Sequence, residues 1–220
     1  MPALYAFDAY GTLLDVHSAA ARLAGRIGGD WQRLSEVWRT KQLEYTWVHA
    51  AVGKPASFWT LTERSLDYAI AATGIRIDDA TRAALLDAWR ELEAYPEVVA
   101  ALARLRQSGA RLAVLSNGDP DLLERAVDSA GLAGLFEHVL SVADAGTFKP
   151  MPAVYRLAVE AFDTVPQRIT FCSSNRWDIA GASAFGFHTV WINRTGRPDE
   201  YPDMPSARVL TTLDGLSPVA

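Results

Sequence analysis

The sequence predicts an α/β fold, in which a doubly wound, mainly parallel sheet forms a core domain and a helical domain is inserted into that core. Three observations support this prediction. Short apolar runs typical of buried strands recur along the chain, the later runs alternate with helical patterns, and a long stretch after the first run is helical throughout. Alternating strands and helices form parallel βαβ units.

Four apolar runs are predicted to be buried strands. Each is short, and the first three lead directly into polar or glycine-containing turns, as buried strands usually do. The four runs are Leu4–Phe7, Arg111–Leu115, Arg168–Cys172 and Thr189–Ile192.

Helical patterns separate the later runs. Pro120–Ala130 opens with a proline in its first turn and ends before Gly131, which are common start and stop signals of a helix. Ala153–Phe162 and Ile179–Phe185 have the same apolar spacing. We therefore expect strand–helix–strand units in the second half of the chain.

The stretch 16–93 is rich in Ala, Leu, Trp, Arg and Glu and contains no convincing strand; Thr81–Glu93 is its clearest helix. We expect 1–15 and 94–220 to form the α/β core and 16–93 to form a helical cap domain. Ligands of parallel sheets bind beyond the carboxyl ends of the strands. A helical insertion just after the first strand would cover that edge.

Composition limits the possible functions. The chain has 220 residues, about half of them apolar, and a formal charge of −5. This composition allows a well-buried core and argues against a nucleic-acid or membrane-surface partner. A single cysteine, Cys172, excludes an intramolecular disulfide, and the four histidines have no metal-binding spacing. The first residues lack a basic region and reach an acid at position 8, so we expect no signal peptide. No apolar run approaches roughly 20 residues, and we therefore expect a soluble cytoplasmic protein.

Polar clusters follow the predicted strands. Taken singly, each has an ordinary explanation as a turn, a solvated loop or a helix cap. Their order along the chain, at one edge of a parallel sheet, instead indicates an active site in which Asp8 is a nucleophile. The clusters are Asp8 with Tyr10, Gly11 and Thr12; Ser116-Asn117-Gly118; Lys149; and Ser173 to Asp178.

The motifs FDAYGTLLD, LSNG, FKPMPAVY and FCSSNRWD, in this order, resemble those of the haloacid dehalogenase superfamily. Tyr10, the SSNxWD cluster and the segment WRTKQLEYTW (Trp38 to Trp47) are most similar to the L-2-haloacid dehalogenases (type II). The resemblance spans nearly the whole chain and implies a Rossmann-like core with a helical cap.

Chemistry gives an independent reason for the same choice. A phosphatase of this superfamily carries an acid two residues after its nucleophile, and that acid protonates the leaving alkoxide. A halide is a stable anion and leaves without a proton, so general acid catalysis adds little. Tyr10 in place of the acid therefore favours a dehalogenase.

The resemblance implies that L-2-haloacids are converted to 2-hydroxy acids and halide, with inversion, through an ester on Asp8. We expect Lys149 to keep Asp8 ionised and Thr12 to orient it. Asp178 would orient or deprotonate the hydrolytic water. Ser173 and Asn175 would steady Asp178, and by resemblance Tyr155 would organise Lys149 and Asp178.

The substrate-binding residues are expected to come from both domains. By resemblance, Arg39 binds the halide with Asn117 beside it. Ser116, together with backbone amides, is predicted to hold the substrate carboxylate. Tyr10, Leu43, Phe58 and Trp177 are predicted to form apolar walls that exclude water.

We expect no metal and no cofactor, because Mg²⁺ prefers several oxygen ligands and the last cluster offers only one acid, Asp178. The alternatives are a magnesium-dependent phosphatase of the same fold and a non-catalytic binding protein; the latter would be expected to have lost Asp8 or Lys149. The expected partners are a small 2-haloacid, halide and a second copy of the chain.

Three features remain open or depart from the family. The family often has Tyr-Lys-Pro where this chain has Phe148-Lys149-Pro150, so one hydroxyl is missing. Arg176 either faces solvent or alters the preferred substrate size. The tryptophans of the insertion suggest more aromatic surface than one thin layer can bury, which favours a homodimer. They are Trp31, Trp38, Trp47, Trp59 and Trp89.

Overall fold

The sheet is parallel throughout the part of the chain that the computed structural model describes, which is residues 2–54, 56–204, 206 and 208–216. Its strand order is β3-β2-β1-β4-β5-β6. This arrangement confirms the predicted α/β class. The strands are β1 (Leu4–Phe7), β2 (Arg111–Ser116), β3 (His138–Ser141), β4 (Ile169–Ser173), β5 (His188–Ile192) and β6 (Arg208–Leu210).

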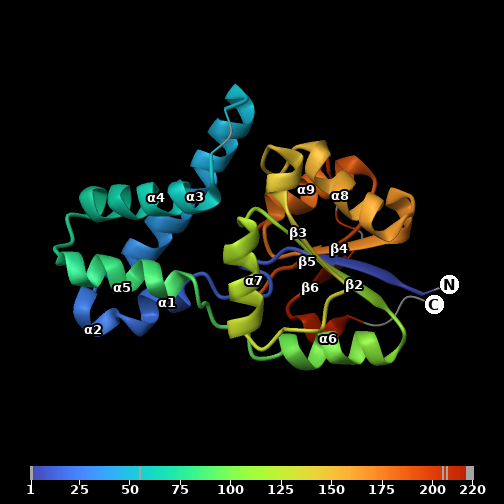
Figure 1. The fold of residues 1–220 in the computed structure, drawn as a ribbon, viewed down its shortest axis with the longest axis horizontal. Helices are drawn as coiled ribbons and strands as arrows, with labels where there is room; N and C mark the ends of the chain where they lie inside the picture. The colour runs from blue at the N-terminus through green and yellow to red at the C-terminus, as the bar shows by residue number, and fades with distance from the viewer. Residues whose placement is uncertain (1, 55, 205, 207, 217–220) are drawn as a thin grey trace.

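Helices cover both faces of the sheet. Figure 1 shows α8 and α9 on one face and α6 on the other, with both chain ends at the same side of the molecule. Because β1 is covered on both faces, all four of its residues are buried, and it has a continuous apolar run instead of an alternating pattern. The core helices are α6 (Val98–Gln107), α7 (Pro120–Ser129), α8 (Pro152–Phe162) and α9 (Arg176–Phe185).

The helical insertion, residues 16–93, lies beside the sheet in Figure 1. Its long helix α3 packs against α4, and α1 packs against α5. No strand occurs among its described residues. The division into a core domain and a cap domain stays a prediction. The insertion contains α1 (Ser18–Arg22), α2 (Ala24–Ile27), α3 (Trp31–Val52), α4 (Phe58–Thr73) and α5 (Asp79–Trp89).

The five tryptophans of the insertion differ in burial. Trp38 and Trp89 are buried and their rings lie 4.8 Å apart, while Trp31 and Trp59 are partly buried. Of these five tryptophans, Trp47 is the one that is exposed. The expectation that this layer cannot bury its tryptophans is therefore wrong for Trp38 and Trp89, while Trp31, Trp47 and Trp59 keep part of their surface exposed.

The predicted strands are found with ends shifted by at most one residue, but two strands were missed. Strands β3 and β6 lie at the edges of the sheet and are short. Val139 and Val209 are exposed, so neither strand has the continuous apolar run of a central strand. Three short 3₁₀ helices, Val142–Ala145, Pro166–Arg168 and Leu213–Gly215, were also missed.

The helix boundaries differ more. The predicted helix Thr81–Glu93 is Asp79–Trp89, because the Asp78 side chain caps the first turn by accepting a hydrogen bond from Thr81 N. Helix α9 begins at Arg176 instead of Ile179. Trp177 and Asp178 are therefore in its first turn, which gives these side chains fixed directions from a helix.

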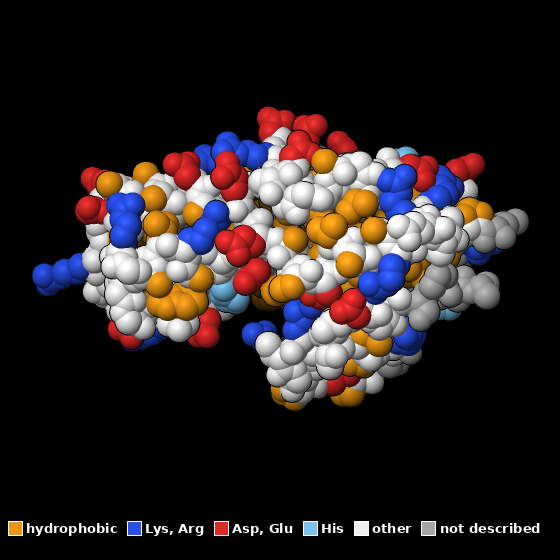
Figure 2. All heavy atoms as spheres, turned by 90° about the horizontal axis from the view of Figure 1, so that it is seen from below, with side chains coloured by type: hydrophobic (Ala, Val, Ile, Leu, Met, Phe, Trp, Pro, Cys, Tyr) orange, Lys and Arg blue, Asp and Glu red, His pale blue; other side chains and the backbone are white. Residues whose placement is uncertain are grey.

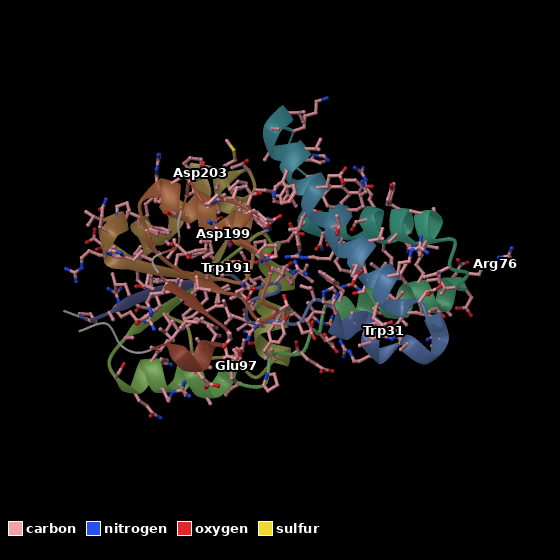
Figure 3. The ribbon with its side chains drawn as sticks, turned by 180° about the vertical axis from the view of Figure 1, so that it is seen from behind. Trp31, Arg76, Glu97, Trp191, Asp199 and Asp203 are labelled. Carbon is pink, nitrogen blue, oxygen red and sulfur yellow. The ribbon has the colours of Figure 1, made fainter. Side chains whose placement is uncertain are left out.

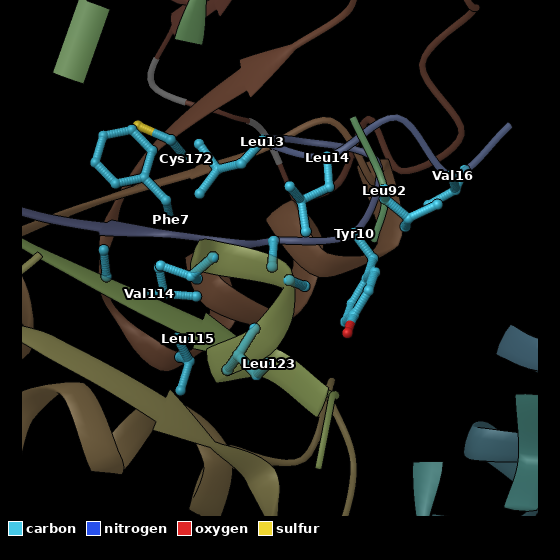
Figure 4. Packing of buried hydrophobic residues seen from close by; sticks show 14 of the residues in the cluster. Phe7, Tyr10, Leu13, Leu14, Val16, Leu92, Val114, Leu115, Leu123 and Cys172 are labelled. Atoms are coloured by element: carbon cyan, nitrogen blue, oxygen red, sulfur yellow. The ribbon is translucent and has the colours of Figure 1, made fainter. Parts of the chain in front are cut away.

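The hydrophobic core reaches the carboxyl edge of the sheet. Figure 4 shows Phe7, Val114 and Cys172 packed across neighbouring strands, and all three are completely buried. Tyr10 follows at the end of β1, and its hydroxyl points away from this cluster. The apolar interior thus continues up to the residues that were predicted to form the site.

Candidate active site

The predicted site residues come together because three adjacent strands end at the same edge. β1 pairs with β2 on one side and with β4 on the other. Asp8 extends this ladder by one bond, donating from its backbone N to Cys172 O at 3.0 Å. Ser116 ends β2 and Ser173 ends β4. This edge is where parallel sheets bind ligands.

A single lysine joins two buried carboxylates. Lys149 Nζ lies 3.0 Å from Asp8 Oδ1 and 2.8 Å from Asp178 Oδ2. Burial alone would lower the pKa of Lys149, but Asp178 and Asp8 outweigh burial and raise that pKa above its ordinary value. The ammonium group therefore stays charged, and the three groups together carry a net charge of −1 when both acids are ionised.

The second oxygen of Asp8 is also fixed. Asp8 Oδ2 accepts hydrogen bonds from Asn175 Nδ2 at 2.7 Å, Thr12 Oγ1 at 2.9 Å and Ser173 Oγ at 3.3 Å. The Thr12 hydroxyl in turn accepts from Ser174 N at 2.8 Å. These bonds orient the Asp8 carboxylate rigidly.

Asp178 is held from both ends and is completely buried. Its Oδ1 accepts from Tyr155 Oη at 2.7 Å, and its Oδ2 accepts from Lys149. Burial raises the pKa of Asp178 to about 6, although the nearby Lys149 opposes that shift. Asp178 is thus a weaker acid than an exposed aspartic acid, and its carboxylate is correspondingly a better base.

One predicted interaction is wrong. Ser173 and Asn175 were expected to steady Asp178, but their side chains bind Asp8. The turn from Ser173 to Asn175 lies beside the end of β1, where Asp8 is. Asp178 follows three residues later, in the first turn of α9. Tyr155 and Lys149 take over the support of Asp178.

Arg39 reaches the same edge from the insertion. It is half-buried on α3, and its Nη2 donates to Tyr10 O at 3.0 Å. Gly11 has φ +92°, and a Cβ there would lie 3.7 Å from Asn175 Nδ2 and 4.0 Å from Arg39 Nη2. Arg39 and Asn175 therefore converge over Gly11, where a side chain would fit in ordinary contact but its backbone conformation would be strained.

Ser116 and Asn117 are buried and organise the loop after β2. Ser116 Oγ accepts from Gly118 N at 3.1 Å, and Asn117 Oδ1 accepts from Lys149 N at 3.0 Å. Asn117 is thus bonded to Lys149, and no hydrogen bond within the described part of the chain joins it to Arg39.

Two of the predicted apolar wall residues pack together. The Tyr10 ring stacks on Trp89 with centroids 6.0 Å apart and lies 5.3 Å from the Phe58 ring. Burial raises the pKa of Tyr10, and its hydroxyl has no hydrogen-bond partner among the described residues. Leu43 and Trp177 are half-buried, and Trp177 packs edge-on against Trp47 instead of against Tyr10.

Arg176 does not face solvent. It is 4% exposed, and its Nε pairs with Asp199 Oδ1 at 2.5 Å. Its Nη2 donates to the carbonyl oxygens of Tyr201 and Met204. Figure 3 shows Asp199 on the sheet side of the molecule, far from Trp31 and Arg76 in the insertion. Arg176 therefore holds the 199–204 loop against α9.

Phe148, where the family often has a tyrosine, is buried.

Sequence reasoning missed a contact that ties the insertion to the core. The Asp119 carboxylate accepts hydrogen bonds from Phe58 N at 3.0 Å and Trp59 N at 2.7 Å, at the start of α4. Asp119 directly precedes Pro120 and so resembles an ordinary cap of its own helix, α7. No sequence signal indicates that its partners lie about 60 residues away.

Two surveys of the described residues are negative. No group of three or more His, Cys, Asp or Glu side chains gathers in a way that could hold a metal ion. None of the helices described is both long enough and apolar enough to cross a membrane.

Comparison with known proteins identifies the class. The family model for haloacid dehalogenase-like hydrolases matches residues 2–186. A dehalogenase crystal structure superposes with a TM-score of 0.94 at 38% identity, covering 97% of this chain and 94% of that one. The chain therefore belongs to the haloacid dehalogenase-like hydrolases, as its motifs predicted.

Within this class, the relatives that match most of the chain include L-2-haloacid dehalogenases, and the chain belongs to that family. (S)-2-haloacid dehalogenase 1 of Pseudomonas sp. (strain CBS-3) is 43% identical over 210 residues, which is 96% of this chain and 92% of that protein. The L-2-haloacid dehalogenase of Xanthobacter autotrophicus with chloropropionic acid covalently bound has a TM-score of 0.84 at 33% identity, with 97% and 96% of the two chains covered.

Proposed function

We propose that this protein is a hydrolytic dehalogenase that converts L-2-haloacids to 2-hydroxy acids and halide, with inversion, through an ester on Asp8. The observation that carries the proposal is the arrangement of Asp8, Lys149 and Asp178. It provides an immobilised carboxylate nucleophile, a cation beside it and a basic carboxylate within one buried cluster. Preferred halogen and chain length do not follow from it.

The first step is a displacement by Asp8. A carboxylate oxygen attacks the carbon that bears the halogen from the side opposite the halogen. A carbon–oxygen bond forms, the carbon–halogen bond breaks, and its electron pair leaves with the halide. In-line attack inverts the carbon. Arg39 converges on this site over Gly11, and we assign it to the departing halide, where its charge stabilises the developing anion.

The second step is hydrolysis of the ester. Water attacks the Asp8 carbonyl carbon while Asp178 takes one proton from that water. The ester bond then breaks, and the departing alkoxide takes the second proton of the same water, which leaves a 2-hydroxy acid and the Asp8 carboxylate. The Asp8 carboxylate is restored with one oxygen from water. The pKa of about 6 leaves Asp178 largely ionised at neutral pH, as a general base must be. The proton on Asp178 then leaves to solvent.

The residue roles extend to the substrate. We assign Ser116 and nearby backbone amides to the substrate carboxylate, with Asn117 beside them. Tyr10 and Phe58 supply an apolar wall, supported by their ring contact. Leu43 and Trp177 are assigned to the same wall from the sequence prediction alone.

The magnesium-dependent phosphatase is not favoured. Its leaving-group acid would have to be Tyr10, and burial raises the pKa of this phenol further above its ordinary value, which makes it a poorer acid. The Lys149 ammonium also lies between the two carboxylates that would otherwise be free to ligate Mg²⁺. We therefore propose metal-independent activity.

The test is halide release from L-2-chloropropionate with EDTA present, with para-nitrophenyl phosphate plus Mg²⁺ in parallel. Halide release without metal and no phosphate hydrolysis are the expected results. Phosphate hydrolysis without halide release would overturn the proposal. Isotope from H₂¹⁸O in Asp8 after a single turnover would report the ester directly, because the hydrolytic oxygen enters the carboxylate first.

We also propose a cytoplasmic homodimer with no nucleic-acid or membrane partner. Trp47, Val48 and Val52, near the end of α3, are 38%, 52% and 58% exposed and give an apolar surface for self-association. Figure 2 shows acidic and basic side chains interspersed on one face instead of forming a basic stripe. A monomeric mass by light scattering would contradict the dimer, and cell fractionation tests the location.

A further inference from the structure

A chain of buried polar groups lies behind Arg39. Arg39 Nη1 donates to Gln42 Oε1 at 2.8 Å, and Gln42 Nε2 donates to Thr62 Oγ1 at 2.6 Å. The Thr62 hydroxyl donates to Phe58 O at 2.8 Å. Gln42 and Thr62 are both completely buried. The chain thus runs from the guanidinium on α3 to the backbone of the neighbouring helix α4.

These hydrogen bonds pair every buried donor with an acceptor in only one arrangement. The Thr62 hydroxyl has a single proton, and it donates this proton in a hydrogen bond to Phe58 O. Thr62 Oγ1 must therefore accept from Gln42. The Gln42 amide then has to place its nitrogen toward Thr62 and its oxygen toward Arg39. In the flipped amide, an N–H group would face the guanidinium N–H groups, and two donors would be left unpaired in a buried site. Thr62 therefore determines that Arg39 meets an acceptor.

The acceptors of Arg39 are neutral. Its guanidinium binds the amide oxygen of Gln42 and the carbonyl oxygen of Tyr10. Among the residues that the structure describes, no ion pair within 4.0 Å involves Arg39. Other arginines do form ion pairs, and most of those pairs lie on the surface. A neutral acceptor fixes the position of a cation without neutralising it. A carboxylate at position 42 would hold Arg39 equally well and compensate its charge.

We propose that Gln42, oriented by Thr62, is a positioning residue that holds the Arg39 guanidinium at the halide site without pairing its positive charge directly with a carboxylate. The inference rests on the proposed function, because it takes the anion that Arg39 receives to be the departing halide. Gln42 itself does not contact the substrate. It limits the conformations of a long side chain that would otherwise lose freedom on each turnover.

The test compares four variants of the full-length enzyme with L-2-chloropropionate. Gln42→Met removes the acceptor, Gln42→Glu adds a charge, Thr62→Val removes the orienting hydroxyl, and Thr62→Ser retains it. Thr46→Val is the matched control. Thr46 is also completely buried and lies on α3, but its hydroxyl bonds only Leu43 O within the same helix. The readouts are kcat, KM, the inhibition constants of chloride and bromide, and the melting temperature.

We expect Gln42→Met to lower kcat about 10- to 100-fold, the range of one hydrogen bond to a charged group, and to weaken halide inhibition by a similar factor. Gln42→Glu should weaken halide inhibition at least as much without a loss of melting temperature. Thr62→Val should show a smaller loss in the same direction. Thr62→Ser and Thr46→Val should keep wild-type halide inhibition.

Halide inhibition separates positioning from a merely structural role, since loss of folded protein lowers the amount of active enzyme without changing an inhibition constant. Wild-type halide inhibition in Gln42→Met or in Gln42→Glu would overturn the inference. If Gln42→Met does not fold, Thr62→Val against Thr62→Ser decides the question in the same way. Wild-type enzyme that releases no halide would overturn the proposed function instead, so the two failures are distinguishable.

Discussion

Asp8 and Asp178 are joined through one ammonium group, with Lys149 Nζ 3.0 Å from the first carboxylate and 2.8 Å from the second. The two acids nevertheless have different surroundings. Asp8 accepts three further hydrogen bonds at its other oxygen, whereas among the described residues Tyr155 is the one donor to the other oxygen of Asp178. More donors stabilise a carboxylate more strongly. This asymmetry fixes the direction of the Asp8 carboxylate, whereas burial raises the pKa of Asp178 and suits that carboxylate to accept a proton.

The first prediction concerns the pH dependence of kcat. Burial raises the pKa of Asp178 to about 6, and a protonated Asp178 cannot accept a proton from the hydrolytic water. As the pH falls through about 6, kcat should therefore fall about tenfold per pH unit, and above that value it should reach a plateau. Stopped-flow or steady-state halide release between pH 4.5 and 8 measures this. A flat profile down to pH 5 would exclude Asp178 as the base.

The second prediction concerns Tyr155→Phe. The hydrogen bond from Tyr155 stabilises the Asp178 carboxylate and lowers its pKa, in opposition to burial. Removing the hydroxyl should raise the pKa of Asp178, so the acid limb of the kcat profile should move to higher pH. At pH 6.5 the variant should lose more activity relative to wild type than at pH 8.

Ser108→Ala is the control for Tyr155→Phe, because its hydroxyl bonds Leu105 O at the end of α6, away from the active site. It should leave the acid limb unchanged. An equal loss of activity at every pH in Tyr155→Phe would instead mean that the tyrosine acts through packing against its aromatic neighbours Phe171, Phe185 and Phe187.

The third prediction ranks the donors to Asp8 Oδ2. Asn175 is the closest at 2.7 Å, and Ser173 is the most distant at 3.3 Å. A hydrogen bond to a charged group contributes about 1.5–3 kcal/mol, and a long one contributes less. Asn175→Ala should therefore lower kcat roughly 10- to 100-fold, and Ser173→Ala should lower it less. Single-turnover formation of the ester measures the effect on attack; a reversed ranking would contradict the geometry.

The sequence predicts that the polar side chains after the strands meet at one edge of the sheet, because they follow buried strands. Asp8 and Ser173 are placed by the ends of β1 and β4, and the ends of adjacent parallel strands must lie together. The edge strands β3 and β6 escaped prediction for the same physical reason: with one unpaired side and exposed valines, they lack the apolar run that identifies a central strand.

Side-chain direction could not be predicted where a helix or a long-range contact decides it. Arg176 carries a charge beside the site, and its sequence neighbours do not reveal that it turns toward Asp199. Gln42 similarly looks like one polar residue in an amphipathic helix. Its burial depends on how α3 packs against α4, and that packing is encoded in residues far apart in the chain.

The fourth prediction concerns the contact between Asp119 and α4. The Asp119 carboxylate accepts from Phe58 N and Trp59 N, two donors at the helix start that have no partner within the helix. Asp119→Ala should lower the free energy of unfolding by about 1–2 kcal/mol, the usual cost of a lost cap. Because the capped helix also carries Phe58 and Thr62, the variant should raise KM for L-2-chloropropionate as well.

Ser57→Ala is the matched control for Asp119→Ala. Ser57 caps the same helix by accepting from Thr60 N at 3.0 Å, but it belongs to the insertion itself and does not connect α4 to the core. Both variants should lower stability in urea unfolding by similar amounts, and only Asp119→Ala should raise KM several-fold. Equal KM values would show that Asp119 acts as a helix cap alone. A higher KM only in Asp119→Ala would show that this carboxylate holds α4, and with it the apolar wall, in position beside the strand ends.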